Sequence, residues 1–255
     1  MLYIKYVYTH PKNKININIS KSSSNKKKKM TKIQGFNQLE NAHFIKLFKL
    51  EKEKYKQILN PYSEKYENGD TYRGEHNHTG QKHGLGIMYY ANGNILQARW
   101  KNDEASGSGY LISPDGTELI GIWKNNQLHG TKNKIRYPSG SEYEGNTEYS
   151  AASGYGILTT QEIDIFQGTW VNNELNGYAH ILYQDGNSYQ GFMQNNEKCG
   201  WGVYSWTNGN VYNGYWYKDE LHGDGVLQTH GQVYHGPWEL GQQLGERNEI
   251  QDTEH

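Results

Sequence analysis

A unit of about 23 residues recurs along most of this 255-residue chain. One anchor position, nearly always glycine, returns eight times at intervals of 22 to 24 residues, at Gly74, Ala98, Gly121, Gly145, Gly168, Gly191, Gly214 and Gly236. A register kept this often indicates a repeat architecture, in which each unit buries its apolar side against its neighbours. The period therefore limits the possible folds more than any single motif does.

Each unit contains an aromatic-x-Gly-x-aromatic segment, such as Tyr212, Gly214 and Trp216. In a strand these alternate positions project from one face, so they form a column with a gap in its middle. We expect an aromatic side chain of the adjacent hairpin to lie in that gap. Five of the seven tryptophans hold the last position of the column, which predicts a stripe of indoles along one sheet face: Trp100, Trp123, Trp170, Trp216 and Trp238.

Two kinds of turn signal alternate along the repeats. Polar pairs that tolerate positive φ follow the column, at Asn102-Asp103, Asn125-Asn126, Asn172-Asn173, Asn195-Asn196 and Asp219-Glu220. A second strand then opens with Gly-x-Gly and closes at a pair such as Asn92-Gly93 or Asp185-Gly186. Two strands and two tight turns per unit leave no room for crossover helices. Residues 65–245 are therefore predicted to form an all-β, elongated, single-layer antiparallel meander of about eight hairpins and roughly 16 strands.

The column, the two turns and the His-Gly pairs at residues 83–84, 129–130 and 222–223 closely resemble the MORN (membrane occupation and recognition nexus) repeat. Several positions depart from that pattern. Ala98 replaces the anchor glycine, Lys132 and Ala179 replace the last glycine of Gly-x-Gly, and Thr147 stands where tryptophan is usual. The fourth unit also lacks the asparagine pair, so we expect the array to be least regular near residues 140–165. Pro237 in the shortened last unit predicts a cap against further strand pairing.

The segments outside the repeats have a different composition. Residues 1–35 are rich in Lys, Asn and Ser and are predicted to be a disordered basic tail, unless Met30 is the true start. Residues 36–60 have near-helical apolar spacing before Pro61 and predict one amphipathic helix. Residues 246–255 form an acidic tail. Residues 1–59 hold 14 Lys and three Glu, so a basic segment precedes an acidic repeat region.

Catalytic, metal and cofactor chemistry is not predicted. The three histidines His76, His78 and His83 could suggest a metal site, but His83 belongs to the repeat's own His-Gly pair. Ser108 lies within a repeat Gly-x-Gly rather than in a nucleophile elbow. Proteins similar to MORN proteins sometimes add a phosphatidylinositol phosphate kinase or a SET-type methyltransferase domain, and the few residues after Gly245 are too short for either. The resemblance leaves two alternatives to a scaffold: a regulatory MORN part like that of phosphatidylinositol-4-phosphate 5-kinases and, less favoured, a fragment of a SET-type methyltransferase. We expect no catalytic residue, no bound metal and no cofactor.

The expected function is therefore binding. The predicted partner contacts are the aromatic residues Tyr72, Trp100, Trp123, Tyr143, Phe166, Trp170, Tyr189, Tyr212, Trp216, Tyr234 and Trp238, which would hold a helix or an extended peptide of a protein partner. A single-layer sheet needs a cover for one face, and the candidates are the 36–60 helix, a second copy of the chain, or that partner.

A membrane is the alternative partner. Lys26, Lys27, Lys28 and Lys29 could contact an anionic lipid surface, at about 1 kcal/mol per lysine, although a solvated tail is the simpler interpretation. No apolar run is long enough to span a bilayer, no signal peptide is expected, and nucleic acid is not an expected partner. The single Cys199 allows no intramolecular disulfide, which favours a reducing, cytoplasmic location. Proteins that the chain resembles are often ciliary, cytoskeletal or cell-cortex scaffolds, and the Asn, Lys and Gln bias suits a protist genome.

Overall fold

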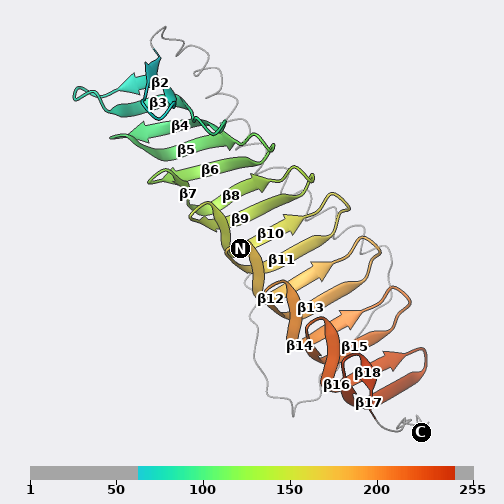
Figure 1. Cartoon of the computed structure of the whole chain (residues 1–255). Coiled ribbons are helices and arrows are strands. Elements are labelled where there is room, and N and C mark those ends of the chain that lie inside the picture. The colour runs from blue at the N-terminus through green and yellow to red at the C-terminus, as the bar shows by residue number, and fades with distance from the viewer. Residues whose placement is uncertain (1–62, 245–255) are drawn as a thin grey trace, which may run out of the picture. The chain divides into compact units, whose positions relative to one another are not determined.

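The computed structural model describes residues 63–244, and in that range the chain consists of strands and turns without a helix. The strands form one open antiparallel sheet of 18 members, and they succeed one another along it in chain order (Figure 1). The prediction of an all-β, single-layer meander is confirmed. The predicted tail 1–35, the predicted helix 36–60, the lysine run and the tail 246–255 lie outside the described residues.

The N-terminal half of the sheet contains β1 (Glu64–Lys65), β2 (Thr71–His76), β3 (Lys82–Tyr89), β4 (Ile95–Lys101), β5 (Glu104–Ile112), β6 (Glu118–Lys124), β7 (Gln127–Leu128), β8 (Gly130–Arg136) and β9 (Glu142–Glu148). The C-terminal half contains β10 (Ala151–Thr159), β11 (Ile165–Val171), β12 (Glu174–Leu182), β13 (Ser188–Gln194), β14 (Glu197–Ser205), β15 (Val211–Tyr217), β16 (Glu220–Thr229), β17 (Gln232–Glu239) and β18 (Gln242–Gln243). The count exceeds the predicted 16 because β7 and β8 are two pieces of one repeat strand and because β1 precedes the first unit.

The tight turns after the column have both central residues at positive φ, as the polar pairs predicted. Asn195 and Asn196 have φ of 50° and 69°. The seventh unit differs from the prediction, because its turn residues are Lys218 and Asp219, with φ of 49° and 67°, whereas Glu220 begins β16. Type I′ turns need two left-handed residues, and the register of the neighbouring strands places them one residue earlier than composition suggested.

The two glycines of each Gly-x-Gly motif are required for different structural reasons. The first lies at a β-bulge in the second strand, where the register shifts, and it has positive φ, as at Gly154 (81°) and Gly200 (59°). The second has no such φ but lies beneath an aromatic ring. A Cβ added at Gly202 would lie 2.6 Å from Cε2 of Tyr189, closer than any side chain can be accommodated.

The least regular part of the sheet is residues 127–136, so the prediction of residues 140–165 is wrong. In the predicted range β9 and β10 pair across a bulge like that of the other units. The second strand of the third unit contains one additional residue, and Lys132 adopts a positive φ of 60° at this point. In consequence Asn133, not Lys132, lies opposite Gly145 at the position of the second glycine. Asn133 is fully buried and its Nδ2 donates to Thr147 Oγ1 at 2.7 Å.

This polar pair occurs where aromatic partners are missing. In four units a tyrosine ring covers the glycines and a tryptophan of the next unit packs against it, but here Leu119 and Thr147 hold those two positions. Asn133 Oδ1 also accepts from the backbone N–H of Ile122 at 2.8 Å, so the buried amide is hydrogen-bonded on both sides. A buried amide is tolerated because it is satisfied.

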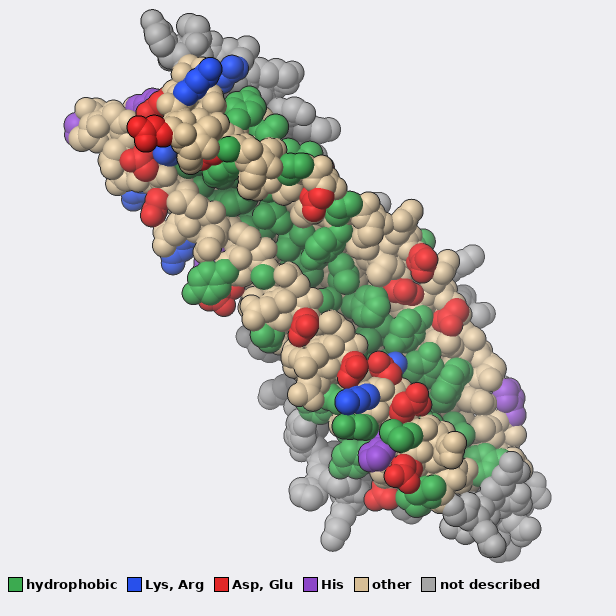
Figure 2. Space-filling view, in the orientation of Figure 1, with side chains coloured by type: hydrophobic (Ala, Val, Ile, Leu, Met, Phe, Trp, Pro, Cys, Tyr) green, Lys and Arg blue, Asp and Glu red, His purple; other side chains and the backbone are tan. Residues whose placement is uncertain are grey.

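Apolar side chains concentrate on one face of the sheet, called here the core face, which carries the aromatic column. Figure 2 shows hydrophobic side chains in a band that crosses successive strands. The buried cluster runs from Tyr72 in β2 to Trp238 in β17 without interruption. The opposite face, called the outer face, carries the alternate residues of each strand. The repeats therefore share one thin core rather than forming separate cores.

Candidate protein-binding surface

The tyrosines of the core face cover glycines of their own hairpin. Tyr189 folds over Gly191 and Gly202, and its hydroxyl donates to the carbonyl of Phe192 at 2.8 Å. The same bond recurs at 3.0 Å from Tyr72, 2.7 Å from Tyr143 and 3.1 Å from Tyr212 to the carbonyl three residues later. The expectation that the adjacent hairpin fills the gap is therefore wrong for these units, because the ring comes from two residues earlier on the same strand.

The tryptophans join consecutive units. Nε1 of Trp216 donates to the carbonyl of Gly202 at 3.2 Å, and its ring meets Tyr189 edge-on at a centroid distance of 5.5 Å. Trp100 and Trp170 make the equivalent Nε1 bonds at 3.1 Å to the preceding second strand. Four units thus contribute a tyrosine that the next unit's tryptophan packs against, in the pairs Tyr72–Trp100, Tyr143–Trp170, Tyr189–Trp216 and Tyr212–Trp238. These indoles make contacts between repeats.

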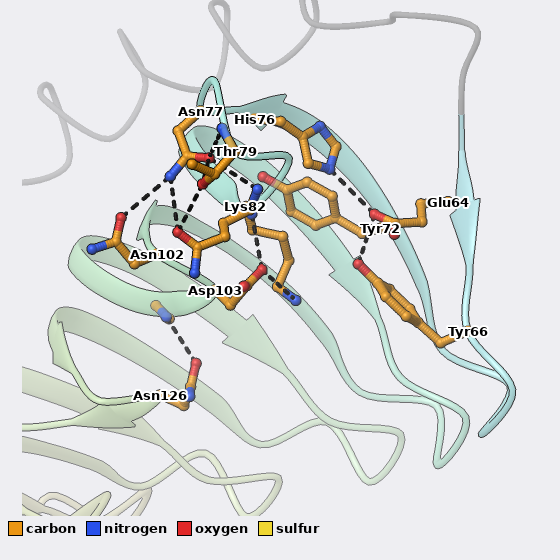
Figure 3. A network of polar contacts seen from close by, with 12 residues as sticks. Glu64, Tyr66, Tyr72, His76, Asn77, Thr79, Lys82, Asn102, Asp103 and Asn126 are labelled. Atoms are coloured by element: carbon orange, nitrogen blue, oxygen red, sulfur yellow. Dashed lines mark hydrogen bonds and ion pairs between the residues drawn. The ribbon is translucent and has the colours of Figure 1, made fainter.

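The tight turns form a second connection between repeats. The N–H of Asn196 donates to the carbonyl of Leu175 at 3.1 Å, and its Oδ1 accepts from the Leu175 N–H at 2.8 Å. Asp103 and Lys82 make the same pair of bonds in the first two units, and Asn126 accepts in the next (Figure 3). The hydrogen bond from the Lys82 N–H lowers the pKa of Asp103. Asn and Asp serve here because they adopt positive φ and also accept a bond.

Two half-buried lysines fill space where a unit lacks its own tryptophan. In the sixth unit Met193 holds that position, and Lys198 lies opposite it. Nζ of Lys198 is 5.4 Å from the ring centre of Trp216 and 3.0 Å from Asp219 Oδ1. Lys82 is equivalent in the first unit. A cation over aromatic faces is attracted by their electrons, so these lysines pack as part of the aromatic layer.

The structure brings all eleven sequence-predicted contact residues together on the core face. Ten of them are buried, and Phe166 is half-buried, packed against the cluster. Burial explains these rings as packing groups of the sheet, because they offer a partner little free surface. Whether any of them also contacts a partner stays a prediction.

Half-buried rings border the core face in both halves, at Tyr66, Tyr90 and Tyr137 as well as in the C-terminal half, where four of them form a rim of neighbouring rings. Tyr183 lies 6.5 Å from Phe166 and 6.0 Å from Tyr204, and Tyr204 lies 4.7 Å from Trp206, measured between ring centroids. Burial raises the pKa of Tyr204, so its hydroxyl is a neutral donor at physiological pH. The sequence analysis missed three of these four, although an aromatic residue recurs at this place, before the second turn of several units.

The outer face differs between the two halves. In the N-terminal half it carries a charged cluster in which Arg136 bonds Glu118 at 3.0 Å and Glu142 at 2.8 Å, and Lys134 bonds Glu142 at 2.6 Å. Burial raises the pKa of Glu142, but the hydrogen bonds from Lys134 and Arg136 outweigh that effect and lower it overall. In the C-terminal half the outer face carries exposed aromatic side chains instead.

The described residues offer few features of other chemistry. His76 Nε2 lies 3.2 Å from Glu64 Oε2, and within residues 63–244 no three acidic, histidine or cysteine side chains converge as metal ligands. Across the same range there is no helix of the length and apolarity that a bilayer crossing requires.

Comparison with known proteins gives one family and several distant structural neighbours. The MORN repeat family model matches residues 80–95, 97–118, 120–131, 166–188, 189–211 and 212–229. Alsin of Rattus norvegicus is 26% identical over 111 residues, which cover 40% of this chain and only 7% of alsin.

Two solved structures share 16% and 15% identity with the chain. The TCP domain of Drosophila melanogaster SAS-4, in complex with a proline-rich motif of Ana2, has a TM-score of 0.38 and covers 64% of this chain and 88% of its own. The TCP10 domain of Danio rerio CPAP has a TM-score of 0.30, with coverages of 69% and 94%. The family match falls on the hairpins whose columns, glycines and turns are described above, and the chain belongs to the MORN repeat family.

Proposed function

We propose that this chain is a protein-interaction scaffold in a ciliary, cytoskeletal or cell-cortex assembly, and that a helix or extended peptide of its partner lies along the core face. The observation that carries the proposal is the rim of half-buried rings at Phe166, Tyr183, Tyr204 and Trp206, next to a rigid buried column. Aromatic residues that are held in place and partly exposed are the usual anchors of protein interfaces.

The hydrogen-bonding pattern supports a passive binding surface. The tyrosine hydroxyls, the indole N–H groups of three tryptophans and the turn amides all bond to backbone groups of the same or the adjacent unit. These bonds fix the rings before any partner arrives, so binding would lose little conformational freedom. The rim then provides pre-positioned apolar contacts in an extended line, as a helix or peptide ligand requires.

Proximity labelling with the full chain in its own cells tests this proposal. The variant Tyr204→Ala/Trp206→Ala removes two rim rings, and Tyr149→Ala, which alters a 69% exposed residue in the β9–β10 turn, is the matched control. We expect the double variant to lose the principal labelled partners while keeping the far-UV circular dichroism of the parent, and the control to retain them. An identical partner set in both would contradict the rim, and partners from none of the three assemblies would contradict the location.

A membrane-tethering role is the second candidate, favoured by the 14 lysines among residues 1–59. Replacing Lys26 to Lys29 by glutamine should then abolish flotation of the full chain with phosphatidylserine liposomes at low salt, because anionic surfaces attract clustered lysines. Absence of any salt-sensitive flotation of the parent chain would remove this role and leave the scaffold proposal untouched.

A further inference from the structure

We propose that the outer face from β10 to the start of β16 is a second docking site, which binds a basic, proline-rich segment of a partner protein in the polyproline II conformation. It lies on the face opposite the rim, and it does not depend on the function proposed above. Three features of the described residues define it: a row of exposed rings, the spacing of that row, and a parallel row of carboxylates.

The row consists of the middle residues of successive Gly-x-Gly motifs and their cross-strand partners. Tyr155, Tyr178 and Trp201 are 55%, 43% and 42% exposed. Tyr178 meets Phe192 edge-on at 5.6 Å, and Trp201 meets the 48% exposed Tyr215 at 5.1 Å. Tyr155 and Trp201 are flanked by glycine on both sides, and Tyr178 by Gly177 and Ala179, so the chain neighbours of these rings carry small side chains or none. Exposed rings that line up across several strands indicate an interaction surface rather than isolated apolar residues.

The spacing of the row fits one peptide conformation. Tyr155, Tyr178 and Trp201 lie in β10, β12 and β14, two strands apart each time. Neighbouring strands are about 4.8 Å apart, so successive rings recur about every 9.6 Å across the sheet. A polyproline II helix has three residues per turn and rises about 3.1 Å per residue, so one of its edges recurs about every 9.3 Å. Prolines at every third position would meet successive rings, and aromatic surfaces are the usual partners of such helices.

Charge defines the rest of the ligand. Glu174, Glu197 and Glu220 are exposed and open β12, β14 and β16, so they repeat at the same two-strand interval as the rings. Each pairs in register with an outer-face residue, as Glu220 does with Tyr217, and no ion pair to them is recorded within residues 63–244. Lys218, in the turn beside Glu220, already lies over the Tyr217 ring at 5.5 Å, so the surface open to a basic ligand ends before this ring. A row of carboxylates beside a row of rings complements a ligand that alternates proline with lysine or arginine.

The same face of the N-terminal half lacks the row of exposed rings, and its positions equivalent to the three glutamates include Glu104, which pairs in register with Lys101, and Gln127, which pairs with Lys124. The positions equivalent to Tyr178 hold Leu85 and Ser108, and the cross-strand positions hold Arg99 and Ile122. An arginine there would repel a basic ligand, and no exposed ring is available for proline. The proposed site is therefore confined to the units of the C-terminal half, and Ile122, which is 45% exposed, serves as a control position of matched geometry.

Fluorescence polarisation with the full chain tests the proposal. The probe is a labelled peptide of four Pro-Pro-Lys repeats, and the comparison probes are four Pro-Pro-Glu repeats and four Ala-Ala-Lys repeats. We expect the first probe to bind at low salt and the other two to bind at least ~10-fold more weakly. Trp201→Ala and Tyr178→Ala should each weaken the first probe by about 10-fold, Glu197→Lys by about 5-fold, and Ile122→Ala by less than 2-fold.

Each alternative outcome has a definite meaning. Equal binding of the Ala-Ala-Lys probe would overturn the polyproline assignment in favour of charge alone or a helical ligand, and equal binding of the Pro-Pro-Glu probe would overturn the role of the carboxylates. No binding of Pro-Pro-Lys at millimolar concentration would overturn the site. The core-face variant Tyr204→Ala/Trp206→Ala should leave probe binding unchanged. The outer-face proposal can therefore be contradicted independently of the proposal that a partner binds the core-face rim.

Discussion

The two faces of the C-terminal half both carry aromatic residues, but they use them in opposite ways. On the core face Tyr189 and Trp216 are buried, cover glycines and bond to backbone carbonyls. On the outer face Tyr178 and Trp201 are more than 40% exposed, and each lies edge-on against its own cross-strand partner, Phe192 and Tyr215 respectively. Residue type is the same, and the alternation of a strand decides which ring is buried in the core face and which is exposed on the outer face. The comparison teaches that function and stability can be separated by mutation within a single repeat.

The largest difference between the faces should appear at alkaline pH. Burial raises the pKa of Tyr143 and Tyr189 well above the usual value, and that of Tyr212 to about 12. Because the folded pKa is the raised one, the stability contributed by the neutral phenols is fully present below pH ~10, the unfolded value, and is lost as pH rises toward the folded pKa. Thermal midpoints followed by circular dichroism should fall steeply above pH ~10. In Tyr212→Phe the fall should be shallower, and equal slopes would contradict the assignment.

Truncation of one tryptophan on each face sharpens the comparison. Trp216→Ala should lower the free energy of unfolding by about 3–5 kcal/mol, because it leaves a cavity between Tyr189 and Tyr212 and removes the Nε1 bond. Trp201→Ala should cost less than about 1 kcal/mol, since solvent already covers much of the ring. Urea unfolding measures both. Similar losses for the two variants would break the distinction between the faces.

A glycine pair tests whether the core-face rings require the space beneath them. Gly202→Ala would place a Cβ 2.6 Å from Cε2 of Tyr189 and should destabilise by about 3 kcal/mol through overpacking. Gly236 occupies the anchor position of the last unit, where a Cβ would meet nothing closer than 3.8 Å. Gly236→Ala should be neutral or stabilise by about 0.5 kcal/mol. Chemical denaturation of the two alanine variants measures the difference, and a destabilised Gly236→Ala would show that the anchor glycine matters for another reason.

The smallest effect is expected at a strained turn. Ile163 has φ of 73° at the turn position that glycine holds elsewhere, with Gly93 and Gly186 at 89° and 87°. A β-branched residue is disfavoured there, so Ile163→Gly should raise the free energy of unfolding by about 0.5–1 kcal/mol despite the added chain entropy. Ile165→Gly, two residues later in β11, should instead destabilise by at least about 1 kcal/mol. Differential scanning fluorimetry distinguishes the two, and a loss at residue 163 would contradict the strain argument.

The sequence predicted the architecture because the repeat is locally encoded. The 23-residue period, the alternation of the column and the paired turn residues each act within one hairpin, and they agree across eight units. The sheet, the meander order and the shared face of the tryptophans follow from these signals. The predictions from the sequence were wrong where the structure depends on several strands at once. The array was expected to be least regular at residues 140–165, but the irregularity lies at Lys132 and Asn133 of the third unit. There the chain has one extra residue, and Asn133 fills the buried position opposite Gly145.

The sequence by itself determined the period, the fold class and which residues share a face, because these depend on spacing and backbone preference alone. Only the tertiary structure decided which rings are accessible. Burial of Tyr189 depends on Gly202 in the facing strand and on Trp216 in the next unit, whereas Trp201 stays 42% exposed because on the outer face its cross-strand partner Tyr215 covers only part of the ring. Accessibility is a property of what neighbouring strands place around a side chain, and no window within one repeat contains that information.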